Sequence, residues 1–215
     1  MNPFTERSTL PAELPPFAEI RDEDYEPAFE RGMADQMVEV AAIVAEPEAA
    51  TFENTIVALE RSGQVLRRVS AAFFTRTSSD GTDFVRDLEA RIAPRLAVHE
   101  DAIRLNGELF RRIETVWALR DRLGSEERYL VERYHVEFTL AGAALDDAQK
   151  DELKRMNERL SVLTTRFDAN LLADTNSLAV HLTDPAELDG LAADERSAAE
   201  AAARSRTSRR CREAR

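Results

Sequence analysis

The residues best suited to metal or acid–base chemistry are three histidines, His99, His135 and His181. His99 is followed by Glu100, which is how the zinc-binding pattern HExxH begins, but that pattern needs a second His one helical turn later. Ile103 stands there instead, so this stretch cannot form such a site. The histidines lie 36 and 46 residues apart without a helical partner. We interpret them as surface or boundary residues, with a metal site assembled by folding as the less favoured alternative.

Adjacent carboxylates offer a second set of candidates for acid–base chemistry. Asp146 and Asp147, and likewise Glu126 and Glu127, stand where apolar periodicity restarts. At a helix start a carboxylate caps free amides and meets the positive end of the helix dipole, which stabilises by about 0.3–1 kcal/mol. We therefore interpret both pairs as helix-capping residues.

Other catalytic motifs are absent from the sequence. It contains no glycine-rich phosphate loop, GxSxG elbow or CxxC pair. The single cysteine, Cys211, cannot form an internal disulfide, and nothing fixed stands beside it to lower the pKa of its thiol. The sequence thus predicts no catalytic, cofactor-binding or metal-binding residue in this chain.

Composition favours a helix-rich globular protein. Of the 215 residues, 43% are hydrophobic and 33% charged, with only 7 Gly and 8 Pro. No run approaches 18 consecutive apolar residues, and the start MNPFTERSTLPAELPPF does not have the basic and apolar regions of a secretory signal. We expect a cytoplasmic protein that does not bind membranes.

The net charge of −12 is unevenly distributed along the chain. Residues 204–215 hold six Arg and one Glu, a net +5, so the preceding body carries −17. Such a body repels nucleic acid and anionic membranes. The basic tail could attract nucleic acid, but it has no interleaved aromatic residues. We therefore rank nucleic-acid binding last and predict no nucleic-acid partner.

Apolar spacing predicts an all-α fold, an antiparallel bundle of about six amphipathic helices. Residues 51–74, TFENTIVALERSGQVLRRVSAAFF, show the cleanest stripe and are expected to form one helix that begins at Thr51, with Gly63 in the one vacant place. A helix from Asp24 to Ala45 precedes it, and a loop over 75–82 follows. Further helices are expected over 84–103, where Pro94 should kink or split the helix, 106–124 with Asn106 as its cap, 125–141, and 146–174.

The last of these helices carries a near-heptad of apolar residues. Leu153, Met156, Leu160, Leu163, Phe167 and Leu171 make up this pattern. We favour a bundle core for them, with a dimerising coiled coil as the alternative.

The predicted organisation has four parts. Residues 1–23 form an extended lead-in and 24–174 the helical bundle. Residues 175–203 hold an incomplete segment, with one short strand at 177–182, where Leu178, Val180 and Leu182 alternate, and an Ala-rich helix at 194–203. Residues 204–215 form an Arg-rich tail without apolar periodicity, which we expect to be disordered.

Several long phrases of the sequence resemble the N-terminal region of bacterial peptidyl-dipeptidases, members of the thimet oligopeptidase family of zinc metallopeptidases. The resemblance is collinear over roughly Asn2 to Ala203. It is carried by MNPF and STLP at the start, YEPAFERGM, the 51–74 stretch, LNGELFRRIETVWALRD, RYHVEFTLAGAAL and NERLSVLTTRF.

This resemblance implies a mostly helical enzyme with a deep channel that admits short peptides and removes dipeptides from their C-termini. In the family the zinc and its HExxH ligands belong to the C-terminal half, so the resemblance assigns no catalytic residue here. We expect this chain to be a truncated wall of that channel and inactive alone, with residues from Arg204 onward arising from a shifted reading frame. The alternative is a stand-alone helical interaction module that self-associates through exposed apolar surface.

Overall fold

The computed structural model describes residues 2–79, 81–178, 180, 182 and 184–213. These fall into two compact units, one ending at Ala169 and one beginning at Asn170, and we describe each by itself. The described ranges contain helices and turns and no strand, which confirms the predicted all-α class. None of the described helices is long and apolar enough to cross a membrane.

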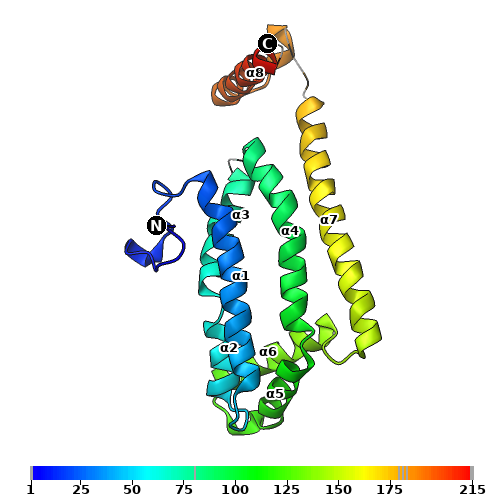
Figure 1. The fold of residues 1–215 in the computed structure, drawn as a ribbon. Coiled ribbons are helices and arrows are strands. Elements are labelled where there is room, and N and C mark those ends of the chain that lie inside the picture. The colour runs from blue at the N-terminus through cyan, green and yellow to red at the C-terminus, as the bar shows by residue number, and fades with distance from the viewer. Residues whose placement is uncertain (1, 80, 179, 181, 183, 214–215) are drawn as a thin grey trace. The chain divides into compact units, whose positions relative to one another are not determined.

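The first unit is built on three long helices that lie side by side, α1, α3 and α4, with α2, α5 and α6 gathered at one end (Figure 1). The bounds in chain order are η1 Pro11–Glu13, α1 Asp22–Ala45, the π-helix η2 Phe52–Val57, α2 Ala58–Arg61, α3 Gln64–Ser79, α4 Asp83–Arg104, α5 Gly107–Ala118, η3 Arg120–Arg122, α6 Ser125–Ala141 and α7 Asp147–Ser177, whose last turns belong to the second unit.

The core consists of two apolar clusters. One joins α1, α3 and α4 and is rich in aromatic rings, with Phe73 meeting Tyr25 and Phe29 edge to face at centroid distances of 5.2 and 5.3 Å. Edge-to-face ring pairs stabilise the fold by more than the apolar area that they bury accounts for. The other joins α1, the η2–α2 segment, α5 and α6 around Ile56, Leu109 and Ile113. The apolar stripes predicted for these helices supply most of both clusters.

The N-terminal lead-in is anchored through Phe4. Its ring is buried 5.4 Å from that of Tyr25, and its carbonyl oxygen accepts a hydrogen bond from Arg68 Nε at 3.1 Å. Asn2 Nδ2 also donates to the carbonyl of Asp24 at 2.7 Å. The lead-in is therefore held against α1 and α3.

A single glycine sets how closely α1 and α3 approach. A Cβ atom at Gly32 would lie 2.7 Å from the backbone nitrogen of Leu66, closer than real Cβ contacts come. Only a residue without a side chain lets the two backbones meet at this point.

The stretch 51–74 is not one helix, which corrects the prediction. Thr51 caps it as expected, because its Oγ1 accepts from the amide of Asn54 at 3.1 Å. The first turns form η2 and α2, and the helix then stops at Ser62, which is extended, and Gly63, which has φ of +68°. Glycine adopts this left-handed conformation at little cost, so the vacant place in the stripe is a break between helices.

Other helix boundaries follow the sequence more closely. Asn106 caps α5 as predicted, its Oδ1 accepting from the amides of Glu108 and Leu109, both at 3.0 Å. The predicted loop at 75–82 is mostly wrong, because α3 continues to Ser79 with serine and threonine hydroxyls bonded to carbonyls one turn back. Pro94 does not split α4, which runs unbroken from Asp83 to Arg104.

The prediction that the near-heptad of α7 forms a bundle core is also wrong for most of its residues. Met156, Leu160, Leu163 and Phe167 are 55, 61, 48 and 64% exposed. The half-buried positions are Leu153, Asn157, Ser161 and Thr165, one turn apart on a different side of the helix. Periodicity detected an amphipathic helix, but its apolar side is not the side that packs.

The second unit differs from the sequence prediction in two places. The strand predicted at 177–182 is not seen in the described residues of that stretch: Ser177 ends α7, Leu178 is in a turn, and residues 180 and 182 have no regular structure. Residues 179 and 181 lie outside the described residues. After η4 Pro185–Leu188, helix α8 runs from Ala193 to Glu213, so the tail expected to be disordered from Arg204 continues the helix. Five of the ten residues from Arg204 to Glu213 are arginines, which are good helix formers, and this favours the extension.

Candidate functional site

A pocket of about 480 Å³ lies between α1, α2, α3, α4 and α6 in the first unit. One part of its wall is apolar and includes Leu66, Phe74 and Phe138. The other part is polar, with side chains from four different helices: Gln36, Glu60, His99 and Tyr134. A pocket of this size and mixed lining is typical of small-molecule or side-chain binding.

His99 lies in the pocket wall and is bonded to α1. Its Nε2 lies 2.7 Å from Gln36 Oε1, and Gln36 Nε2 in turn lies 3.4 Å from Ser62 Oγ. Burial lowers the pKa of His99, because the imidazolium would lose solvation there. The neutral ring therefore donates its Nε2 proton to Gln36, which leaves Nε2 unable to accept a proton from a substrate.

The break at Gly63 shapes the same wall. A Cβ atom at Gly63 would come within 2.6 Å of the Gln36 amide, so the glycine makes room for the His99–Gln36 pair. The amide of Gly63 also donates to Glu39 Oε2 at 2.7 Å. The interrupted helix thus brings backbone and side-chain polar groups of α1, α2 and α4 together.

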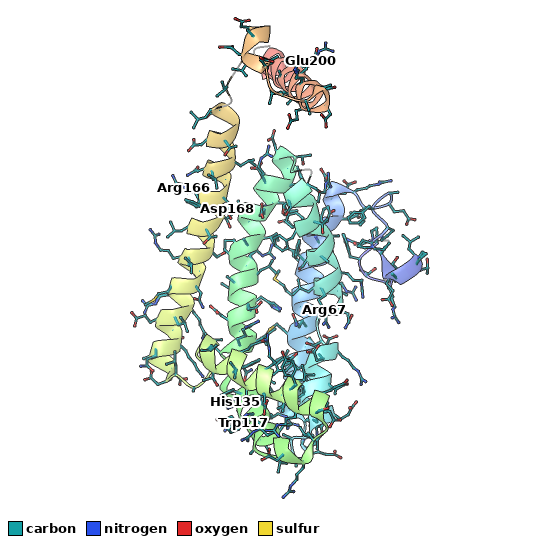
Figure 2. The ribbon with its side chains drawn as sticks, turned by 180° about the vertical axis from the view of Figure 1, so that it is seen from behind. Arg67, Trp117, His135, Arg166, Asp168 and Glu200 are labelled. Carbon is teal, nitrogen blue, oxygen red and sulfur yellow. The ribbon has the colours of Figure 1, made fainter. Side chains whose placement is uncertain are left out.

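Tyr134 closes the side of the pocket formed by α6. Its hydroxyl donates to Glu60 Oε1 at 2.9 Å, and burial together with this carboxylate strongly raises the pKa of the phenol. Arg67 borders the same region and donates to the carbonyl of Ser62 at 2.9 Å; its position on α3 is labelled in Figure 2. A phenol held protonated in this way can position a ligand but cannot act as a base near neutral pH.

The pocket contains no pair of groups arranged for nucleophilic catalysis among the described residues. Ser62, its most buried hydroxyl, gives its proton to the carbonyl of Leu59 at 2.7 Å. Glu100 is paired with Arg104 at 2.5 Å and Glu137 with Arg133 at 2.6 Å. The arrangement can bind, but its polar groups are already occupied by one another.

The other two candidate histidines, His135 and His181, do not line this pocket among the described residues. His135 is stacked between Trp117, at a centroid distance of 4.2 Å, and Phe110, at 5.7 Å, and Figure 2 shows it beside Trp117. Arg120 covers the Trp117 ring, 4.1 Å from its centroid. This packing makes His135 a structural residue. His181 lies outside the described residues, as does the side chain of Cys211.

The carboxylate pairs cap helices, as the sequence predicts. Asp146 Oδ1 accepts from the amide of Gln149 at 2.9 Å at the start of α7, and Glu127 Oε2 accepts from the amide of Gly124 at 3.0 Å at the start of α6. Within the ranges that the structure describes, no three His, Cys, Asp or Glu side chains are grouped to hold a metal ion. The described residues of this chain therefore do not fit a zinc site.

Sequence reasoning missed Gln36 and Tyr134 as pocket residues. The available signal was weak: Gln36 stands between Asp35 and Met37, and Tyr134 between Arg133 and His135, so neither position stands out from its surroundings. What makes them pocket residues is the contact each makes with a residue more than 60 positions away, which helical periodicity does not reveal.

Comparison with known proteins gives a consistent set of relatives. The chain is 42% identical to dipeptidyl carboxypeptidase of Escherichia coli over 206 residues, which is 95% of this chain and 30% of that protein. It is 38% identical to dipeptidyl carboxypeptidase of Salmonella typhimurium over 94% of the chain, again 30% of the relative. It is 26% identical to oligopeptidase A of Escherichia coli over 90% of the chain and 29% of the relative. No family profile matches the chain.

The chain therefore spans about a third of the length of the curated relatives that it matches.

Proposed function

The chain is an N-terminal part of the dipeptidyl carboxypeptidase family, and on this premise we propose that it forms one wall of the substrate channel of a zinc peptidyl-dipeptidase. In its full-length form such an enzyme would release dipeptides from the C-termini of short peptides in the cytoplasm. The observation that carries the proposal is the 42% identity over 95% of this chain.

Two features of the structure support a non-catalytic role for this part. The polar groups of the α1–α4–α6 pocket are bonded to one another, and His99 is neutral and donates to Gln36. The apolar side of α7 is exposed, as expected for a helix that packs against further protein. The zinc and its ligands would come from the remaining 70% of the polypeptide.

The proposal is tested by assaying the isolated chain with zinc and a short peptide blocked at its N-terminus. We expect no dipeptide release, because the described residues provide no metal ligands in a group. Release that a chelator abolishes would overturn the proposal. An intact dipeptidyl carboxypeptidase in the same assay is the positive control.

A stand-alone helical interaction module is the second candidate, favoured by the same exposed side of α7. It would self-associate or bind a protein partner through that apolar surface. Size-exclusion chromatography with a hydrophobic dye separates the two. An oligomer that binds no dye would favour the module, because self-association covers the apolar surface, whereas a monomer that binds dye fits a wall whose remaining enzyme is absent.

A further inference from the structure

The apolar side of α7 is exposed within the first unit. Met156, Leu160, Leu163 and Phe167 follow one another at steps of three or four residues and form what we call the α7 stripe. A groove of about 550 Å³ runs along it, lined by α7 residues alone, including Met156, Leu160 and Leu163. Such a run of apolar surface normally marks a contact site for further protein.

The side of α7 that faces the bundle is polar beyond Leu153. Asn157 Nδ2 donates to Asp101 Oδ1 of α4 at 2.8 Å, and Ser161 and Thr165 continue the half-buried row. If the bundle were the only partner of α7, the helix would turn its leucines inward, because burying one Leu stabilises by about 1.5–3 kcal/mol. The orientation therefore indicates a second partner on the opposite side.

Two arginines on this face have no partner among the described residues. Arg159 and Arg166 lie seven positions apart, so they share one side of the helix, and they border the α7 stripe. Most arginines of α1, α3 and α4 are in contrast paired with carboxylates or carbonyl groups, as in Arg91–Glu26 at 3.0 Å. A partner that covers the stripe would gain by placing carboxylates opposite the two free guanidinium groups.

We propose that the α7 stripe with Arg159 and Arg166 is the docking surface for an amphipathic segment whose apolar side chains are bordered by carboxylates. The occupant is a segment of the 70% of the dipeptidyl carboxypeptidase polypeptide that this chain does not match. The inference rests on the proposed function and names the interface through which the wall joins the rest of the enzyme. A second copy of the chain fits less well, because it would add its own Arg159 and Arg166 to the same interface and only one carboxylate that lines the groove, Glu152.

The test places this chain in a full-length enzyme. In a chimera, it replaces the matching 30% of Escherichia coli dipeptidyl carboxypeptidase, and Leu160→Glu/Leu163→Glu is compared with Leu140→Glu, a control on α6 where the side chain is 82% exposed. Tm and dipeptide release are measured for each chimera. Tm and oligomeric state are measured for the isolated chain with the same substitutions.

We expect the stripe variant to lower the Tm of the chimera by at least 5 °C and its dipeptide release at least tenfold, while leaving the Tm of the isolated chain within about 1 °C. Leu140→Glu should change neither. Arg159→Glu/Arg166→Glu should weaken the chimera in the same direction, less so at high salt, because the charges lie at the border of the interface.

Three other outcomes distinguish the docking surface from the proposed function and from self-association. A chimera whose Tm is unaffected by the stripe variant overturns the docking surface while leaving the proposed function standing. A folded chimera without dipeptide release overturns the proposed function, and its Tm comparison still decides the docking surface. An isolated chain that is a dimer and becomes a monomer with Leu160→Glu/Leu163→Glu shows that a second copy is the occupant, which also overturns the proposal.

Discussion

Asn157 of α7 donates a hydrogen bond to Asp101 of α4, with 2.8 Å between Nδ2 and Oδ1. Asp101 is only 9% exposed, and burial raises the pKa of its carboxyl above the usual 3.8, although the Asn157 amide opposes the shift. The contact fixes the polar side of α7 toward the bundle. It also places an ionised carboxylate where ionisation is unfavourable, which makes the contact sensitive to pH.

Asp101→Asn should raise Tm at pH 7. The raised pKa means that the folded chain holds this proton more tightly than the unfolded chain, so the stabilisation is complete below pH 3.8 and is lost as pH rises through the folded pKa. Asparagine avoids the ionisation, and its Oδ1 still accepts from Asn157. Thermal unfolding between pH 3.5 and 7.5 should show a gain that shrinks toward acid pH.

Asp87→Asn is the control for this prediction, because Asp87 is an exposed carboxylate on the same helix. It should change Tm little at any pH. A Tm for Asp101→Asn that is lower than wild type at pH 7 would show that the charge of Asp101 stabilises the contact instead.

His99 should make stability fall in mild acid. Its pKa is lowered below 6.5 by burial, so as pH falls the unfolded chain binds the proton first and the free energy of unfolding decreases until the folded pKa is passed. His99→Gln has no such group and can still donate an amide proton to Gln36. We expect the denaturation midpoint of wild type to fall between pH 7 and 5 more steeply than that of the variant.

Parallel slopes for the two proteins over that range would contradict the assignment of a neutral His99. The charge of Glu100 raises the pKa of His99, against the larger lowering by burial. The Glu100→Gln variant should therefore show a steeper fall of the denaturation midpoint than wild type. The comparison separates the two causes.

Much of the fold was predictable because helical periodicity and capping are local. The cap at Asn106, the cap at Thr51 and the apolar face of α5 each depend on residues within four positions of one another. The resemblance of the phrases to peptidyl-dipeptidases was readable for the same reason, and the relatives confirm it. The domain boundaries at 23, 174 and 203 stay predictions.

What periodicity could not give is which partner covers a face. A vacant place in a stripe fits a glycine inside a helix as well as a break. At Gly63 the backbone takes the left-handed conformation, and its amide donates to Glu39 of α1, a long-range contact that periodicity does not reveal. Likewise an apolar stripe predicts that some part of a protein covers it but does not identify that part. Leu160 and Leu163 are exposed, so the bundle does not cover them. The pocket formed by Gln36, His99 and Tyr134 was hidden because its contacts are long-range.

Arg112 should be the arginine whose loss destabilises the bundle most. From α5 its Nη1 donates to the carbonyls of Glu46 and Glu48, at 3.0 and 3.3 Å, and its Nη2 to Asn54 Oδ1 at 3.1 Å. These bonds hold the turn between α1 and η2, where the chain reverses. Arg112→Met keeps the aliphatic stem but leaves three acceptors without this donor, at a net cost of about 2–4 kcal/mol in urea unfolding.

The neighbouring Arg111 provides a matched control. Its side chain is 71% exposed and pairs with Glu108 at 3.4 Å on the same helix, so Arg111→Met should cost less than about 0.5 kcal/mol. Arg112 Nε is buried and has no hydrogen-bond partner among the described residues, so methionine also removes an unpaired donor and recovers part of the cost of Arg112→Met. Equal stability of the two variants would contradict the prediction and show that the turn at 46–50 is held without Arg112, by the bond from Asn54 Nδ2 to the carbonyl of Ala49 at 2.9 Å and by the Thr51–Asn54 cap.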